Sequence, residues 1–203
     1  QEMGYESPMP VQEEVIPFLL GDDNDVIALA QTGTGKTAAF GLPILQKIDV
    51  TTYHPQALVL CPTRELCLQI ADDLNDYSKY IDNLKVLPVY GGSSIESQIK
   101  TLKRGVHVVV ATPGRLLDLM NRKTVDLSLV KNVIMDEADE MLNMGFTDSI
   151  NAILAEVPEN RNMLLFSATM PKEIANITKK YMKNPKEIVI GNKNEGNKNI
   201  RDI

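Results

Sequence analysis

The sequence predicts an α/β domain in which a mainly parallel β-sheet of about seven strands is flanked by helices on both faces. Short apolar runs rich in β-branched residues alternate along the chain with segments of helical periodicity, as they do in strand–helix–strand units. Several runs are continuously apolar, which is typical of parallel strands buried on both faces. With 203 residues the chain has the length of one ordinary domain.

Each element of this prediction follows from a local pattern. The expected strands are Asp25–Ala30, Gln56–Cys61, Lys85–Tyr90, His107–Ala111, Asn132–Asp136, Met163–Ser167 and Glu187–Ile190. Helices are expected over Arg64–Tyr80, after Ser93 and Glu96 (which have capping-box spacing), through Ile150, Ile153 and Leu154, and from Pro171. The tail from Gly191 is polar, so residues 1–190 are interpreted as the domain and residues 191–203 as a linker.

Composition narrows the class of protein. The formal net charge of -6 and the lack of a long basic run argue against tight, purely electrostatic nucleic-acid binding, although one face can still be basic. No apolar stretch reaches the roughly 18 residues of a membrane span, so no membrane association is expected. Cys61 and Cys67 have no metal-ligand spacing, and we expect both to be reduced and buried in an intracellular, cytoplasmic protein.

A glycine-rich turn between an expected strand and an expected helix predicts a phosphate loop. Its residues are Gln31, Thr32, Gly33, Thr34, Gly35, Lys36 and Thr37. Glycines let main-chain N–H groups approach phosphate oxygens, and the helix that follows points its N-terminus at the same anions. Lys36 is expected to reach the β- and γ-phosphates, and Thr37 to offer its hydroxyl to Mg²⁺. The general template has glycine at its first position, where this chain has Ala30.

Two carboxylates after a later strand complete the expected nucleotide site. Asp136 ends an apolar run, where a carboxylate can hold Mg²⁺ directly or through water. Glu137 beside it can orient and activate an attacking water. Because ligands of parallel sheets bind at the carboxyl ends of the strands, both acids are expected near the phosphate loop.

The motifs together resemble the DEAD-box ATP-dependent RNA helicases. Seven of them follow in the family's order: Gly4–Gln12, Ala30–Thr37, Pro62–Leu66, Gly91–Gly92, Thr112–Arg115, Asp136–Asp139 and Ser167–Thr169. The family's form of the phosphate loop also begins with alanine, which accounts for Ala30. The resemblance implies the fold of a RecA-like P-loop NTPase domain, with ATP as substrate and Mg²⁺ as cofactor.

The resemblance also implies roles for individual residues. Gln12 should read the adenine edge with its amide, and Tyr5 should stack on the base. Met9 stands where the family commonly has threonine, and the family's upstream aromatic residue lies before this chain. Asp139 is expected to pair with Ser167 and Thr169 and to couple the nucleotide site to the rest of the domain.

A second group of motif residues is expected to hold RNA. Its members are Thr63, Arg64, Gly92, Thr112, Gly114 and Arg115. Hydroxyls, guanidinium groups and glycine N–H groups suit phosphates and 2′-OH groups more than base edges. No aromatic strip for base stacking is visible. The predicted partner is therefore the sugar–phosphate backbone of single-stranded RNA, bound without sequence preference.

The family's enzyme has a second RecA-like domain in the same polypeptide, and its motifs have no counterpart before Ile203. Since that domain supplies arginines to the ATPase site, the 203 residues are expected to bind nucleotide weakly and to hydrolyse ATP poorly. As a fragment, they are expected to be monomeric. Three alternatives stay open: a DNA helicase of the same superfamily, an ATP-gated RNA clamp that hardly unwinds, and an ATP-binding domain without a nucleic-acid role.

Overall fold

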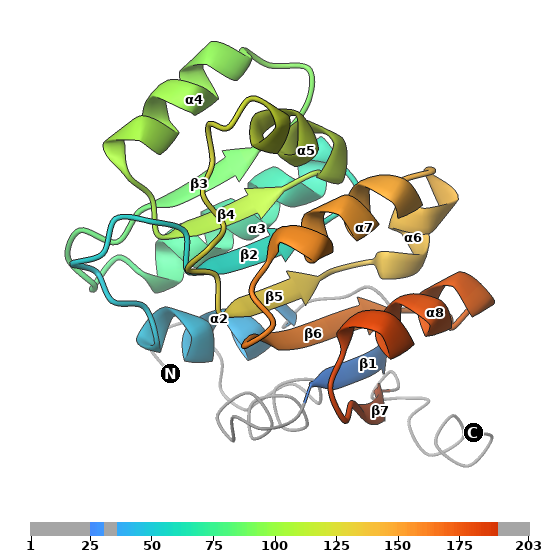
Figure 1. Cartoon of the computed structure of the whole chain (residues 1–203). Helices are drawn as coiled ribbons and strands as arrows, with labels where there is room; N and C mark the ends of the chain where they lie inside the picture. Colours follow the sequence, from blue (N-terminus) through green and yellow to red (C-terminus); the bar gives the residue numbers. More distant parts are fainter. Residues whose placement is uncertain (1–24, 31–35, 191–203) are drawn as a thin grey trace.

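Seven parallel strands form a single sheet in the computed structural model, which describes residues 25–30 and 36–190 (Figure 1). The strands are β1 (Val26–Ala30), β2 (Ala57–Leu60), β3 (Val86–Val89), β4 (Val108–Ala111), β5 (Asn132–Met135), β6 (Asn162–Ser167) and β7 (Lys186–Ile190). Their order across the sheet is β3-β4-β2-β5-β6-β1-β7, and every paired register is parallel. Each predicted strand coincides with an observed one to within a residue at either end, which confirms the predicted fold class.

Helices cover both faces of this sheet (Figure 1). In the described residues they are α2 (Lys36–Gln46), α3 (Arg64–Tyr77), α4 (Ile95–Arg104), α5 (Pro113–Asn121), α6 (Ala138–Asn143), α7 (Thr147–Glu156) and α8 (Lys172–Tyr181). α2 and α3 lie on one face and the other five lie on the opposite face. None of them combines the length and the apolarity of a membrane-spanning segment.

Alternate residues of each strand enter two separate apolar layers. In β1, Val26 and Ala28 pack with Phe40 of α2, whereas Ile27 between them packs on the other face with Ile174 of α8. This alternation follows from the pleat, which sends successive side chains to opposite faces. Burial on both faces explains why the strands read as continuous apolar runs in the sequence.

Two local expectations need correction. The N-cap of α4 is Ser94, whose hydroxyl accepts a hydrogen bond from the Ser97 N–H at 3.3 Å, and not Ser93. The Ser93 hydroxyl instead donates to the Tyr90 carbonyl at 3.3 Å, which holds Ser93 in the preceding turn. The second correction concerns α3. This helix ends at Tyr77, where Ser78 is the C-cap, three residues before the expected end at Tyr80.

Both cysteines are free thiols that the sheet and α3 bury completely, as expected. The Cys67 thiol donates to the Val110 carbonyl at 3.1 Å. A hydrogen bond with Cys67, together with burial, raises the pKa of the Cys61 thiol. Cys61 is therefore a protonated core residue, a state that resists oxidation.

Candidate functional site

The topology gathers the expected site residues at the carboxyl edge of the sheet, in two adjoining groups. Lys36, Asp136 and Ser167 follow or end β1, β5 and β6, which are neighbours in the sheet. Arg64 and Arg115 follow β2 and β4, which lie beside each other in the other half. The first group is the expected nucleotide site and the second is the expected RNA face. The expected residues Tyr5, Gln12, Gln31, Thr32, Gly33, Thr34 and Gly35 lie outside the described residues.

An ion pair between Lys36 and Asp136 joins the start of α2 to the end of β5 at the centre of the first group. The Lys36 Nζ donates to the Asp136 Oδ1 at 2.8 Å, and the two residues are only 8% and 2% exposed. Lys36 is the first residue of α2, and its ammonium lies 5.4 Å from the centre of the Phe166 ring. The Asp136 N–H donates to the Leu60 carbonyl at 2.8 Å, which continues the β2–β5 ladder up to the carboxylate. Sheet pairing therefore fixes the position of this acid.

Glu137 occupies a strained backbone position beside this pair. Its φ and ψ are both 52°, in the left-handed region, which is uncommon for a residue with a side chain. It is the N-cap of α6 but makes no side-chain capping bond. Burial, followed by the charge of Asp136, raises the pKa of Glu137. A raised pKa makes the carboxylate a better proton acceptor, as a general base requires.

A cavity of about 130 Å³ opens at this point of the edge. Among the described residues its walls are Ala30, Lys36, Glu137, Asp139, Glu140, Phe166, Ser167 and Ala168. It therefore places the lysine, the raised-pKa carboxylate and the end of β6 around one space.

Asp139 links α6 to the segment after β6. Its Oδ2 accepts hydrogen bonds from the Thr169 N–H at 3.1 Å and from the Thr169 hydroxyl at 2.8 Å. The Ser167 hydroxyl does not donate to this carboxylate. It donates instead to the Thr169 carbonyl at 2.6 Å. The expected pairing of Asp139 is thus observed with Thr169 but not with Ser167, which contacts Thr169 instead.

Thr37, the expected metal ligand, faces α3 in the structure. Burial raises the pKa of Asp73 in α3, and a hydrogen bond with the Thr37 side chain offsets only part of that rise. The helices are in close contact here, since a Cβ added to Gly41 would lie 2.7 Å from Leu74 Cδ2. The sequence reasoning missed Asp73, which lies 36 residues further along the chain.

The two arginines of the RNA face are held differently. Arg64 is exposed, and its guanidinium carbon lies 5.1 Å from the centre of the Tyr90 ring. Arg115 is half-buried and donates to the Gln98 Oε1 at 3.0 Å and to the Ser93 carbonyl at 3.1 Å. The sequence reasoning also missed Gln98. A signal existed, because this amide stands on the same helix stripe as Ile95, Ile99 and Leu102.

The remaining expected RNA-side residues shape the loops between the arginines. The Thr63 hydroxyl caps α3 by accepting from the Leu66 N–H at 3.1 Å. Thr112 is the buried N-cap residue of α5 and makes no side-chain capping bond. Gly114 is exposed in the first turn of α5, and Gly92 is exposed with a φ of 82°, a turn conformation that favours glycine.

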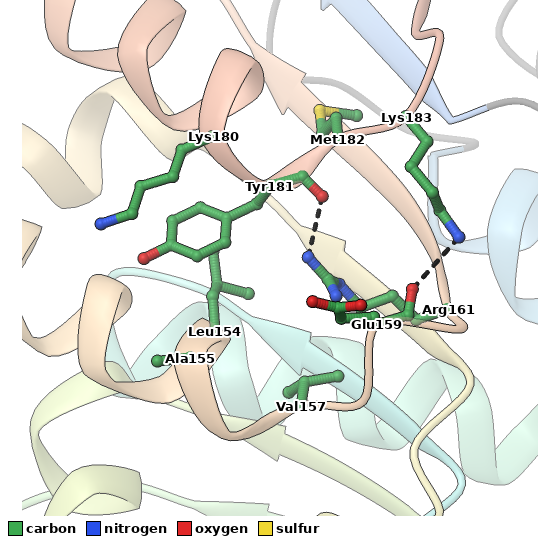
Figure 2. Close-up of a pocket in the computed structure, with 9 residues that line it drawn as sticks. All are labelled: Leu154, Ala155, Val157, Glu159, Arg161, Lys180, Tyr181, Met182 and Lys183. Carbon is green, nitrogen blue, oxygen red and sulfur yellow. Dashed lines mark hydrogen bonds between the residues drawn. The ribbon is translucent and has the colours of Figure 1, made fainter.

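A larger cavity, of about 390 Å³, lies at the opposite edge of the sheet, between the C-terminal ends of α7 and α8 (Figure 2). Arg161, buried in its wall, donates from its terminal nitrogens to the carbonyls of Pro158 at 2.9 Å and Tyr181 at 2.8 Å. Its Nε has no partner among the described residues. At the rim, the Lys183 ammonium donates to the Glu159 carbonyl at 3.1 Å. These bonds join the segments at the ends of α7 and α8. Because the cavity lies at the amino edge of the sheet, it is separate from the nucleotide group at the carboxyl edge.

Comparisons with known proteins agree with this arrangement. The model of the DEAD/DEAH box helicase family matches residues 9–177. An ATP-dependent RNA helicase DeaD of Mycobacterium tuberculosis is 54% identical over 187 residues, which are 92% of this chain and 33% of that protein. The protein of the same name from Escherichia coli K12 is 49% identical over 189 residues, 93% of this chain and 30% of that protein.

A solved structure supports the same assignment. A DEAD box protein from the hyperthermophile Methanococcus jannaschii superposes with a TM-score of 0.87 at 46% identity, covering 93% of this chain and 51% of the other. The chain spans about a third of the length of the curated relatives it matches. From the matched family model, the relatives and the fold, we conclude that this chain belongs to the DEAD/DEAH box helicase family.

Proposed function

We propose that this chain is the ATP-binding domain of an ATP-dependent RNA helicase that works in the cytoplasm. One observation supports the proposal above all: two groups of polar residues share one edge of the sheet, and the β2–β5 pairing connects them. The first group suits a triphosphate with its metal, and the second suits a sugar–phosphate backbone. The relatives named as ATP-dependent RNA helicases point to the same pair of ligands.

The described donors fit a magnesium site that the nucleotide completes. Asp136 offers one buried carboxylate and Thr37 one hydroxyl, and no cluster of three or more acidic, histidine or cysteine ligands occurs in the part of the chain that the structure describes. Mg²⁺ in nucleotide sites takes one or two protein oxygens and fills its other positions with phosphate oxygens and water. When bound, Mg²⁺ would neutralise charge on the phosphates.

The chain's own residues have distinct tasks in hydrolysis. Lys36 leaves Asp136 and donates to the β- and γ-phosphates, because a triphosphate offers it more negative charge than one carboxylate. Glu137 accepts a proton from the attacking water, for which its raised pKa is suited. Asp139, through its two bonds to Thr169, carries a change at the nucleotide to the end of β6.

Adenine recognition is assigned to Gln12 and Tyr5, and contact with the phosphates to Gln31, Thr32, Gly33, Thr34 and Gly35. Residues 1–190 are proposed as the first RecA-like domain and residues 191–203 as the linker to a second one. That second domain would supply the arginines of the ATPase site and the other half of the RNA groove. ATP and RNA would then draw the two domains together, bend the RNA and release one strand of a short duplex.

Equilibrium binding of ATP and GTP, with and without Mg²⁺, tests the nucleotide assignment. The chain should prefer Mg-ATP, and Lys36→Ala should weaken its binding roughly ten- to a hundredfold, as expected for loss of a charged hydrogen-bond donor. Lys131→Ala, an exposed lysine at the opposite edge, is the matched control. Equal affinity of the two lysine variants for Mg-ATP would contradict the assignment.

Binding of single-stranded polyuridylate tests the RNA face. Arg64→Ala and Arg115→Ala should weaken RNA binding and leave Mg-ATP binding unchanged. Arg122→Ala is the control, because Arg122 forms only an exposed ion pair with Asp118. If both arginine variants bind RNA normally, the chain is an ATP-binding domain without this role. On the longer protein, stimulation of ATP hydrolysis by RNA rather than DNA would separate an RNA helicase from a DNA helicase. Strand displacement measured with and without hydrolysable ATP would separate a helicase from a clamp.

A further inference from the structure

A buried amide lies directly beneath the RNA face. Gln98, in the second turn of α4, is only 5% exposed and stands among the apolar residues Ile95, Ile99 and Leu102 of that helix. An amide in such a position costs free energy unless its donors and its acceptor are paired. The structure pairs both ends of the Gln98 amide, and its partners are the expected RNA-side residue Arg115 and two residues, Tyr90 and Ser93, that flank the Gly91–Gly92 motif.

The amide connects two loops that follow different strands. The Gln98 Nε2 donates to the Ser93 hydroxyl at 2.9 Å and to the Tyr90 carbonyl at 3.3 Å, both in the loop after β3. The Gln98 Oε1 accepts from the Arg115 Nη1 at 3.0 Å, in the first turn of α5. Arg115 closes the ring by donating from Nη2 to the Ser93 carbonyl at 3.1 Å.

The same loop supports the second arginine. The Tyr90 residue whose carbonyl accepts from Gln98 also lies with its ring beneath the Arg64 guanidinium, 5.1 Å away. Gly92, with its φ of 82°, stands in the turn between Tyr90 and Ser93. A change at Gln98 would therefore reach Arg115 directly and Arg64 through Tyr90.

The chemistry of the amide explains why glutamine is needed here. Only an amide side chain both donates and accepts at this reach, so glutamate or leucine cannot satisfy all three partners. An arginine has a flexible stem, and fixing it beforehand lowers the entropy lost when it binds phosphate. Within the part of the chain that the structure describes, the hydrogen bonds of Arg115 to Gln98 and Ser93 use two of its five N–H groups, so others remain to meet a phosphate.

We propose that Gln98 is a positioning residue for RNA, which holds the Arg115 guanidinium and the Tyr90–Ser93 loop in the orientation that receives the sugar–phosphate backbone. The role rests on the proposed function, because it requires Arg115 to contact RNA. It adds a residue of α4 that does not itself touch the ligand.

A double-mutant cycle on RNA affinity tests this role. With single-stranded polyuridylate as the probe, Arg115→Ala and Gln98→Leu should each weaken binding roughly tenfold, since the first removes a charged contact with phosphate and the second removes the hydrogen bond that orients it. Combined, they should weaken it by much less than the product of the two single effects, because the amide acts mainly through the arginine. Gln69→Leu, an exposed glutamine of α3, is the matched control and should bind normally.

The salt dependence of binding supplies a readout that a merely structural role would not change. Loss of one phosphate contact lowers the slope of log K against log salt by about 0.7 for a single strand. Arg115→Ala and Gln98→Leu should show this decrease, and Gln98→Leu should add little to it in the Arg115→Ala background. Gln98→Glu keeps the size of the side chain, so this variant can replace Gln98→Leu in the binding measurements if the leucine variant fails to fold. Its charge should weaken RNA binding at least as much.

Mg-ATP binding should stay unchanged in all Gln98 variants. Independent, multiplying effects of Gln98→Leu and Arg115→Ala, or normal RNA binding by Gln98→Leu and Gln98→Glu, would overturn the positioning role while leaving the RNA face intact. If Arg115→Ala itself binds RNA normally, the RNA assignment of Arg115 fails, and the role of Gln98 fails with it.

Discussion

The two edges of the sheet use their polar residues in opposite ways. At the amino edge, Asp25, His107 and Arg161 each stand one residue before a strand, and the side chain of each is buried against main-chain groups. At the carboxyl edge, Glu137 and Arg115 lie at the starts of α6 and α5, the helices that follow β5 and β4, and are only half-buried. The amino-edge side chains form hydrogen bonds that stabilise the fold, whereas the carboxyl-edge side chains keep polar atoms exposed that could contact a ligand.

Asp25 shows the amino-edge pattern most clearly. Its Oδ1 accepts from the Met163 N–H at 2.9 Å and its Oδ2 from the Lys183 N–H at 2.7 Å. One carboxylate thus joins the start of β1 to the start of β6 and to the loop before β7. His107 does the same at the start of β4, where its Nδ1 accepts from the Lys85 N–H at 3.0 Å.

The comparison predicts that substitutions at the carboxyl edge change activity more than stability. In a protein that joins this chain to the proposed second domain, Glu137→Gln should lower ATP hydrolysis by roughly 10²- to 10⁴-fold, the usual contribution of a general base. Mg-ATP affinity should remain within a few-fold of the wild type, because the amide keeps the size of the carboxylate. Single-turnover hydrolysis and equilibrium binding measure the two quantities; a loss of binding that matches the loss of rate would refute the role as a base.

Substitutions at the amino edge should have the reverse effect. Asp25→Ala leaves the buried Met163 N–H and the part-buried Lys183 N–H without their acceptor, so we expect a loss of about 2–4 kcal/mol in the free energy of unfolding. Asp25→Asn keeps one acceptor oxygen and should lose about half as much. Chemical denaturation measures both, with the exposed Asp118→Ala as control. Folded Asp25→Asn should bind Mg-ATP normally, and impaired binding by the folded protein would break the contrast.

Arg161 should give a smaller effect at the same edge. Arg161→Met retains the apolar stem but loses the bonds to the Pro158 and Tyr181 carbonyls, so we expect a loss of about 1–3 kcal/mol. Lys183→Met, whose ammonium makes one exposed bond in the same cavity, should change stability much less. Equal stability changes for the two variants would show that the buried guanidinium has no special role there.

The sequence predicted the strands and the carboxyl-edge motifs because both depend on local patterns. Continuous apolar runs mark strands buried on both faces, and Lys36 and Asp136 each follow such a run. Both were expected at the carboxyl edge of the sheet, and their meeting at 2.8 Å follows from β5, β6 and β1 being neighbours in the observed strand order.

The amino-edge residues and Gln98 were not predicted because their partners are set by the strand order. Asp25 meets Lys183 across 158 positions of the chain, and no local pattern marks that pair. Gln98 meets Arg115 because β3 and β4 are adjacent, so that the loop after β3 and the start of α5 come together. The misplaced cap at Ser93 arose from two successive serines, of which only the hydrogen bonds show which one begins the helix.

The smallest expected effect is a change in stability whose sign differs between the two edges: removing the charge of Glu137 should stabilise the fold, whereas removing the carboxylate of Asp25 should destabilise it. Burial, followed by the charge of Asp136, raises the pKa of Glu137, so the folded chain binds this proton more tightly than the unfolded chain. The stability that the proton contributes is fully present below the unfolded-state pKa and is lost as the pH rises through the folded-state pKa. The ionised carboxylate therefore weakens the fold at neutral pH, and Glu137→Gln removes that charge.

We expect Glu137→Gln to raise the midpoint of urea denaturation slightly at neutral pH and to leave it unchanged at acidic pH, where Glu137 is protonated. Glu156→Gln, at the exposed end of α7, should show no such pH-dependent gain. A fall in stability of Glu137→Gln at neutral pH would mean that this carboxylate, like Asp25, supports the fold. A gain confined to neutral pH would show that the carboxyl edge keeps a charge that the fold alone does not favour.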